Sequence, residues 1–252
     1  LGQFAFYQCS GFSGSLEILV DTDIYNFKIG DYAFYKCTGL KGSLKLDEDI
    51  ASIGDYAFYQ CSGLTGNLSI SNNVHSIGKN AFYDCHSLGP KLVFYEEDEE
   101  GYDDPQCYYI GDYAFYNCYG FVGTLNLINV FYIGSYAFAQ CSSLSDILMG
   151  DGHYLHICQY AFQSTNFKTL IYGGIIEPSY DYPIALSENI TIMVLHDFEI
   201  FDDYNNNWNI PSFSYRDPTF CGYPVNIQFS VNDANSQSSI KGPDFETEFT
   251  FN

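Results

Sequence analysis

The hydrophobic and polar positions of this chain repeat with a period of about two dozen residues. Residues 53–70 read IGDYAFYQCSGLTGNLSI, and most of this pattern recurs at 29–46, 77–94 and 110–127. The shared template is I-G-x-Y-A-F-Y-x-C-x-G-L-x-G-x-L-x-I. Its copies begin at Leu1, Ile29, Ile53, Ile77, Ile110, Ile133 and Ile157. The sequence therefore predicts seven repeats of about 24 residues in residues 1–172.

A unit of this length cannot bury a hydrophobic face alone, so neighbouring units must stack and share one core. Near the end of each unit, apolar residues such as Leu68 and Ile70 alternate with polar ones, which is typical of a strand with one buried face. Stacked strands of this kind form a parallel ladder. The predicted fold class is a repeat solenoid built on a parallel β-ladder.

The A-F-x-x-C segment of each unit favours a short helical turn. At about 100° per residue, Ala57, Phe58 and Cys61 share one narrow face and point into the core. Tyr56 and Tyr59 point away from the core as an i, i+3 pair. An additional residue, usually glycine, separates the two strand leucines in the first five units and predicts a β-bulge there. These residues are Gly14, Gly42, Gly66, Pro90 and Gly123.

In six units, A-F-x-x-C is followed after three residues by leucine or phenylalanine, with the cysteines at Cys9, Cys37, Cys61, Cys85, Cys118 and Cys141. This AFxxCxxL pattern resembles the BspA-type leucine-rich repeats of bacterial and protozoan surface antigens. The resemblance covers residues 1–172, and Thr165 replaces the cysteine in the last unit. It implies a non-catalytic surface or secreted protein for adhesion, with proteins or glycans on another cell or matrix as partners.

Three segments depart from the template. An acidic insert near 95–104 lengthens the fourth unit, and we expect a solvated loop because the insert lacks EF-hand ligand spacing. Residues 173–228 are richer in proline, asparagine and aspartate, and we interpret them as a C-terminal capping region over the open end of the core. A strand is expected within them at 189–195. Residues 229–252 have the composition of a linker or tail.

The net charge is −22, from 31 acidic and nine basic residues. Such a charge repels nucleic acid and anionic membrane surfaces. No apolar run reaches the length of a transmembrane segment, so none is predicted. Leu1 already lies within a repeat, and we therefore expect the natural N-terminus, with any signal peptide, to lie upstream.

The six repeated cysteines are predicted to be buried free thiols, because in-register neighbours are farther apart than a disulfide prefers. Cys107, Cys158 and Cys221 lie outside that row, and one pair among them could bond in an extracellular protein. His153, His156 and Cys158 have the chemistry of metal ligands, but no fourth ligand accompanies them. We therefore predict no metal site and no cofactor.

Motifs of hydrolases, P-loop proteins and zinc proteases are absent from the sequence, so no enzyme is predicted. Two surfaces could bind a partner instead. One carries the tyrosines of the A-F-x-x-C segments, namely Tyr32, Tyr35, Tyr56, Tyr59, Tyr113, Tyr116 and Tyr136. The other is the polar face of the strands, with Ser43, Lys45, Ser69, Thr124 and Asn126. The tyrosines could equally stack on one another as structural ladders.

Two sequons, at Asn67 and Asn189, are possible glycosylation sites. A glycan on Asn67 would obstruct the strand face. The sequence leaves two functions open. The first is a surface or secreted protein for adhesion or recognition, and the second is an intracellular scaffold for protein assembly, with reduced cysteines and no glycans.

Overall fold

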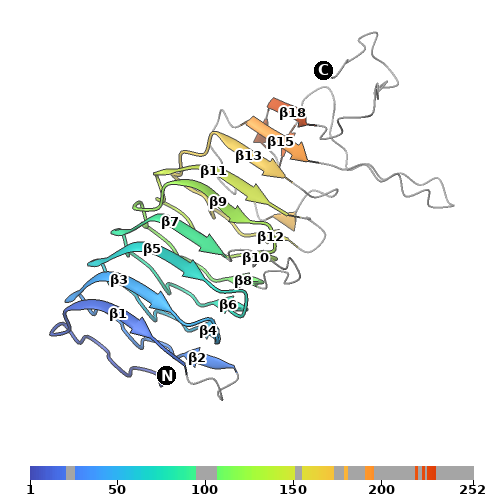
Figure 1. Ribbon diagram of the computed structural model, residues 1–252. Coiled ribbons are helices and arrows are strands. Elements are labelled where there is room, and N and C mark those ends of the chain that lie inside the picture. The colour runs from blue at the N-terminus through green and yellow to red at the C-terminus, as the bar shows by residue number, and fades with distance from the viewer. Residues whose placement is uncertain are drawn as a thin grey trace, which may run out of the picture.

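The computed structural model describes residues 1–20, 26–94, 107–150 and 155–172, together with five strands between 179 and 230. The described coils stack along one axis, so that corresponding strands of successive repeats lie side by side (Figure 1). Every pair of strands between coils is parallel. The predicted solenoid is confirmed.

The strands predicted from the alternating pattern form two parallel sheets. The first contains β1 (Gly14–Ile18), β3 (Leu40–Leu46), β5 (Leu64–Ile70) and β7 (Leu88–Phe94). The second contains β9 (Gly123–Leu127), β11 (Leu144–Met149), β13 (Thr169–Tyr172), β15 (Thr191–Leu195) and β18 (Asn226–Ser230). In β5, Leu64, Leu68 and Ile70 are buried, whereas Thr65, Asn67 and Ser69 are exposed, as the alternation predicts.

The hydrogen-bonded ladder of these strands is interrupted between β7 and β9, where the sequence predicted that it would continue. These strands belong to separate sheets, although the N–H of Val122 still donates to the carbonyl of Pro90 at 2.7 Å. Pro90 has no N–H of its own to contribute to a ladder. The insert follows β7 directly, so the lengthened repeat and the interrupted ladder coincide.

A second ladder, absent from the sequence prediction, runs through the start of each repeat. Its strands are β2 (Phe27–Ile29), β4 (Ile50–Ile53), β6 (Ser76–Ile77), β8 (Tyr109–Ile110), β10 (Tyr132–Ile133), β12 (His156–Ile157) and β14 (Ser179–Tyr180). The template isoleucines pair along it, with Ile53 beside Ile77 and Ile77 beside Ile110. Most of these strands have only two residues, too few for an alternating pattern to reveal them.

The predicted helical turn is wrong, because the A-F-x-x-C segments are successive β-turns and the described residues contain no helix. Alternate amides bond in two directions. The N–H of Tyr59 donates to the carbonyl of Tyr56 at 3.2 Å within the coil, whereas the N–H of Phe58 donates to the carbonyl of Ala81 in the next coil at 2.7 Å. A helix would use all these amides within the segment and leave none for the neighbouring coil.

This turn geometry places large side chains in an uncommon backbone conformation. Tyr56 has φ of 56° and Gln60 has φ of 54°, and the equivalent residues of the other coils have similar values. A positive φ at the third residue is what a type II turn requires. The inward direction predicted for Ala57, Phe58 and Cys61 nevertheless holds, since all three are fully buried.

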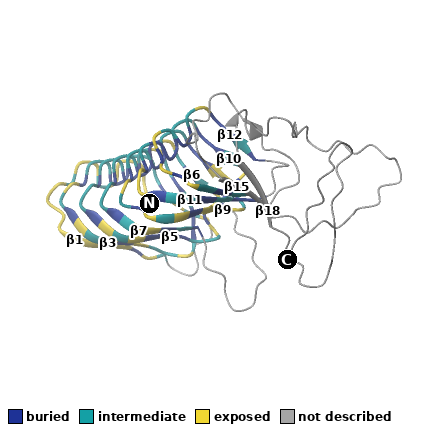
Figure 2. Ribbon diagram, turned by 90° about the horizontal axis from the view of Figure 1, so that it is seen from above, coloured by how far each residue is buried: buried dark blue, intermediate teal, exposed yellow. Residues whose placement is uncertain are grey.

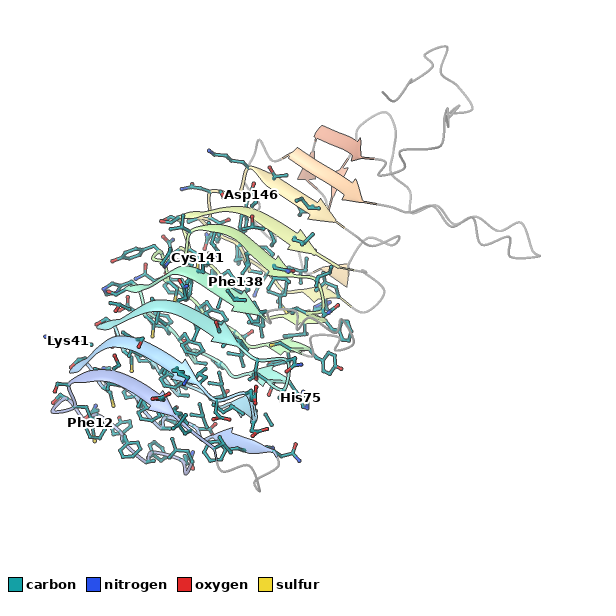
Figure 3. The ribbon with its side chains drawn as sticks, in the orientation of Figure 1. Phe12, Lys41, His75, Phe138, Cys141 and Asp146 are labelled. Carbon is teal, nitrogen blue, oxygen red and sulfur yellow. The ribbon has the colours of Figure 1, made fainter. Side chains whose placement is uncertain are left out.

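The core is a set of columns in which each residue stacks on its counterpart. The ring of Phe82 lies 5.1 Å from Phe58 and 5.2 Å from Phe115, with the rings nearly parallel. Figure 2 shows how buried and exposed residues alternate along the strands of the stack. Phe138 and Cys141 lie inside it, whereas Lys41 and His75 lie on its surface (Figure 3).

Glycines allow the coils to approach closely. A Cβ on Gly78 would lie 2.6 Å from the backbone nitrogen of Asp55, so only glycine fits there without a shift. The predicted bulge is confirmed at Gly66, where the register of β5 against β7 shifts and φ is 80°. Glycine adopts this φ without a steric penalty.

The segments outside the template are described only in part. The predicted insert at 95–104 and the tail at 229–252, apart from the last two residues of β18, lie outside the described residues, as does most of the capping region at 173–228. Within that region, β15 falls at the expected strand and pairs in parallel with β13 and β18. A short antiparallel pair, β16 (Thr219–Phe220) with β17 (Tyr223–Pro224), lies there too. The capping role itself stays a prediction.

Candidate functional site

The polar face of the strands carries the predicted strand-face residues. Ser43, Lys45, Ser69, Thr124 and Asn126 are all exposed on it. Because the hydrogen-bonded ladder is interrupted between β7 and β9, the first three lie on one sheet and the last two on the other. The two sheets follow each other along the stack, with β7 next to β9 (Figure 1).

Polar contacts on this face join neighbouring coils. The Nζ of Lys45 pairs with the carboxylate of Glu17 on β1, at 2.5 Å. Asn67 is exposed, and its Oδ1 accepts a hydrogen bond from the N–H of Lys91 at 3.1 Å. The possible glycosylation site at Asn67 thus lies at the surface, and Asn189 lies outside the described residues.

The tyrosines form two parallel rows along the stack. The first tyrosine row occupies the fourth template position and consists of Phe4, Tyr32, Tyr56, Asn80, Tyr113, Tyr136 and Tyr160. The second tyrosine row occupies the seventh position and consists of Tyr7, Tyr35, Tyr59, Tyr83 and Tyr116. Stacked neighbours within each row have ring centroids between 4.8 and 5.0 Å apart.

The two rows also touch each other. The rings of Tyr56 and Tyr59 lie 5.5 Å apart, and those of Tyr113 and Tyr116 lie 5.7 Å apart. These rings are half-buried, because their faces are covered by neighbouring rings while the rest of each side chain faces outward. The structure thus brings all seven predicted tyrosines together in one aromatic strip, which is two rings wide except at Asn80 and beyond Tyr116.

Burial raises the pKa of several phenols of the strip. It is the largest cause of the raised pKa of Tyr59, Tyr83 and Tyr113, and neighbouring tyrosines raise it further. A neutral phenol can both donate and accept a hydrogen bond. The strip therefore presents a repeated apolar and hydrogen-bonding surface that carries no charge of its own.

Sequence reasoning missed two further aromatic rows beside the second ladder. His75, Tyr108 and Phe131 stack along three coils, with centroids 6.1 and 5.0 Å apart. Tyr109 stacks on Tyr132 at 4.8 Å. The signal was present in the sequence, because Tyr109 and Tyr132 both precede a template isoleucine.

The template cysteines lie inside the stack as free thiols. Five of them, from Cys37 to Cys141, donate to the carbonyl of a phenylalanine in the preceding coil at 2.9–3.1 Å. Burial raises the pKa of Cys61 and of Cys141 to about 12. A thiol held in its protonated form is a poor nucleophile and a poor metal ligand. Cys9, in the first coil, is half-buried.

Cys107 is a buried free thiol, Cys158 is buried, and Cys221 lies outside the described residues. The thiol of Cys158 donates to the hydroxyl of Tyr132 at 3.1 Å, and the ring of His156 stacks on Tyr132 at 5.7 Å. His153 lies outside the described residues. Within the described part of the chain, no three histidine, cysteine or acidic side chains gather as a metal site would require.

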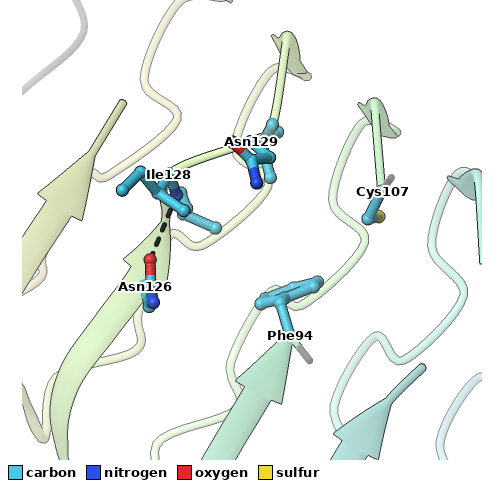
Figure 4. A pocket seen from close by; sticks show the side chains of 7 residues that line it. Phe94, Cys107, Asn126, Ile128 and Asn129 are labelled. Atoms are coloured by element: carbon cyan, nitrogen blue, oxygen red, sulfur yellow. Dashed lines mark hydrogen bonds between the residues drawn. The ribbon is translucent and has the colours of Figure 1, made fainter. Parts of the chain in front are cut away.

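A small cavity lies between the end of β7 and the end of β9 (Figure 4). Its lining includes Phe94, Cys107, Asn126 and Val130, and its volume is about 10 Å³. That is the space of roughly one water molecule, far below the size of a ligand site. This cavity is therefore too small to be the place where the described residues bind a ligand.

The described residues include no helix with the length and hydrophobicity that a membrane crossing requires. Among curated proteins, no sequence matches this chain. Three solved structures of bacterial leucine-rich repeat proteins are similar to it, all at low identity. The protein from T. pallidum has 22% identity and a TM-score of 0.45, with 70% of this chain and 66% of that one covered.

A leucine-rich cell surface protein from Faecalibacterium prausnitzii A2-165 has 18% identity and a TM-score of 0.32, with 70% of this chain and 58% of that one covered. A leucine-rich repeat protein from Bacteroides ovatus ATCC 8483 has 15% identity and a TM-score of 0.35, with 77% and 66% covered. The chain thus spans less than two thirds of the length of each of these proteins.

The family comparison covers more than half of the chain. The model of the BspA type leucine rich repeat region matches residues 1–91 and 104–192, in six copies. Those ranges contain all seven predicted repeat starts. The structure agrees with this match, because each repeat contributes parallel strands to the stack and the A-F-x-x-C turns lie between successive strands. The chain belongs to the BspA-type leucine-rich repeat family.

Proposed function

We propose that this chain is a non-catalytic binding protein, displayed at a cell surface or secreted, that recognises proteins or glycans through repeated shallow contacts. The observation that supports this most is the aromatic strip, which presents the same tyrosine pair in the second, third and fifth coils. Tyrosine gives a large contact area at a low cost in conformational entropy and is enriched in binding hot spots. The strip continues over several coils, so a partner can engage it at several places.

Several weak contacts to one partner can together give a high affinity. Stacked tyrosines lie in neighbouring coils, so a partner bound to one tyrosine pair holds its adjacent side chains or sugars close to further tyrosines. Linked contacts of this kind can raise the overall affinity about 10²- to 10⁴-fold over a single contact. With a net charge of −22, the chain favours a neutral or basic partner over an acidic one.

Adhesion is the more specific part of the proposal. Family membership supports it, since BspA-type repeats are typical of surface antigens. Adhesion also suits an elongated protein whose contacts are shallow and numerous. We accordingly propose cells or extracellular matrix as the place where the partner is found.

The test is binding of the purified protein to cells and to matrix, with and without the tyrosines. Replacing Tyr32, Tyr56 and Tyr113 with serine should abolish most binding. Replacing the same residues with phenylalanine keeps the stacked rings and removes only the hydroxyls, so an intermediate loss is expected. Circular dichroism and thermal melting of each variant would show whether the fold is intact.

Three substitutions on the strand face serve as the control. They test whether any change of exposed residues reduces binding, regardless of the face that carries it. Ser43, Ser69 and Thr124 are exposed, and their replacement with arginine should leave binding largely intact. If these changes abolish binding while the serine variant of the strip binds normally, the strand face is the binding surface. If neither set of changes alters binding, recognition through these repeats is wrong.

A second function, an intracellular scaffold for protein assembly, is favoured by the free thiols. Seven cysteines in the described part of the chain, from Cys9 to Cys141, are free thiols, which suits a reducing compartment as well as burial. Intact mass spectrometry of the native protein separates the two functions. Carbohydrate on Asn67 or Asn189 would exclude the scaffold, whereas nine free thiols without carbohydrate would argue against secretion.

A further inference from the structure

The first tyrosine row lacks one ring. The rings of Tyr32 and Tyr56 lie 4.8 Å apart and nearly parallel, and so do those of Tyr113 and Tyr136. Asn80 occupies the equivalent position in the fourth coil. Tyr56 and Tyr113 each therefore have one face that no ring of the described residues covers.

The backbone of the fourth coil is regular at this point, so the gap arises only because Asn80 has no aromatic ring. In the second tyrosine row, Tyr83 stacks on Tyr59 at 4.8 Å and on Tyr116 at 4.9 Å, and these three residues belong to the same three coils. The N–H of Asn80 donates to the carbonyl of Asp112 in the next coil at 2.8 Å, as its counterparts do. Tyr56 and Tyr113 are thus two stacking steps apart, which leaves room for one planar group.

The base of this gap holds the side-chain amide of Asn80. Asn80 is 7% exposed, and its amide forms no hydrogen bond with another residue in the described part of the chain. No buried side-chain nitrogen or oxygen of the described residues lacks a hydrogen-bond partner, so the amide of Asn80 reaches solvent. Asparagine also tolerates the positive φ of this position. A group that enters the gap could replace water as the hydrogen-bond partner of this amide.

The charges around the gap favour a cation. Asp55 directly precedes Tyr56, and Asp112 directly precedes Tyr113. Asp112 is one of the groups that raise the pKa of Tyr113, so its negative charge reaches that ring. Lys79, which precedes Asn80, carries the opposite charge. Its side chain is exposed and forms no ion pair with the described residues.

We infer that the gap between Tyr56 and Tyr113 is a slot for an arginine side chain of a partner protein. A guanidinium is planar, stacks on aromatic faces and donates several hydrogen bonds in its own plane. Between two tyrosine faces it would stack on both, and its N–H groups would reach the Oδ1 of Asn80. The inference rests on the proposed binding function and identifies the chemistry of one contact on the aromatic strip.

A titration with short blocked peptides tests the slot directly. The probes are Gly-Arg-Gly, Gly-Lys-Gly and Gly-Tyr-Gly, followed by NMR of the Asn80 side-chain amide and of the Tyr56 and Tyr113 rings. The arginine peptide should shift these signals in a saturable way. The lysine peptide should bind about tenfold more weakly, since a compact ammonium cannot stack on two rings. Equal binding of all three peptides would overturn the inference.

Two substitutions at one position act as matched variants. Asn80→Tyr restores the template and fills the gap, so it should keep or raise the melting temperature and abolish arginine binding. Asn80→Ala keeps the gap open and removes the amide, so binding should weaken by about tenfold or less. Arginine binding that persists in folded Asn80→Tyr, or an Asn80 amide signal that never shifts, would show that the gap is not a binding slot.

The slot and the proposed function can fail separately. Wild-type protein and Asn80→Tyr are compared in the same cell and matrix assay. If both bind cells while the peptides leave Asn80 unaffected, the slot is wrong and the binding function stands. If the arginine peptide binds the slot but the protein binds neither cells nor matrix, the slot stands and adhesion is wrong.

Discussion

The thiol of Cys61 donates a hydrogen bond of 3.0 Å to the backbone carbonyl of Phe34, one coil earlier. Four other template cysteines make the same contact with their preceding coils. The cysteine therefore links adjacent coils as well as filling space between them. The template cysteine, which the sequence predicted to be a buried free thiol, is also a hydrogen-bond donor between coils.

Removing this donor should weaken the stack. Cys61→Ala loses both the hydrogen bond and buried volume, and we expect a loss of about 1–2 kcal/mol in the free energy of unfolding. Cys61→Ser keeps a donor in a similar space and should lose less. Urea unfolding followed by circular dichroism measures both variants. Equal losses would indicate that packing alone matters at this position.

Stability should fall at alkaline pH. A thiol in the unfolded chain ionises near its ordinary pKa of 9.0, while burial holds the pKa of folded Cys61 and Cys141 at about 12. Between these values the unfolded state loses protons that the folded state keeps, so unfolding becomes more favourable as pH rises. The stabilising contribution is complete below pH 9 and is lost by about pH 12.

Melting temperatures at half-unit steps from pH 7 to pH 11 would measure this effect. Cys61→Ala removes one of the contributing thiols, so its melting temperature should decline less steeply above pH 9. A wild-type melting temperature that stays constant throughout would contradict the assignment of raised thiol pKa values.

Thiol labelling should distinguish the first coil from the rest. Cys9 is half-buried, whereas Cys61, Cys85 and Cys118 are fully buried. Brief treatment of native protein with iodoacetamide, followed by peptide mass spectrometry, should modify Cys9 first. The buried cysteines should react at the rate of unfolding, and rapidly in urea. Fast native labelling of Cys85 would mean that the stack opens at its centre.

Glycine at the second template position should be indispensable. In Gly78→Ala the new Cβ would meet the backbone of the preceding coil at 2.6–2.7 Å, and we expect a loss of at least about 2 kcal/mol in the free energy of unfolding. Gly11→Ala is the matched control, because nothing lies within 4 Å of a Cβ built there. The measurement is again urea unfolding. Equal effects of the two substitutions would mean that the coils can separate without a penalty.

Several features could be predicted from the sequence because repetition makes local patterns reliable. The stack, its parallel strands and the inward direction of Ala57, Phe58 and Cys61 follow from residues that recur at one period. The bulge at Gly66 was predicted for the same reason. The tyrosine strip was recognised too, since its members share two template positions.

Other features depend on contacts between coils and were not predictable from any single unit. The turn around Tyr56 forms because its amides bond alternately within the coil and to the next coil. The helical periodicity of a single segment contains no information about bonds to the next coil. The second ladder has strands such as β6 and β8 that are too short to show a pattern. The interruption of the strand ladder between β7 and β9 could not be predicted either, because it depends on how two neighbouring coils pair.

The sequence by itself determined the repeat, the core positions and the family, because stacking makes each coil bury the same residues. Tertiary structure alone decided which side chains meet. The stacking of Tyr32 on Tyr56, the hydrogen bond from Cys61 to Phe34 and the gap between Tyr56 and Tyr113 all arise between residues about one repeat apart or farther. Such contacts depend on how closely the coils pack, and that spacing is set by backbone hydrogen bonds and by glycines such as Gly78.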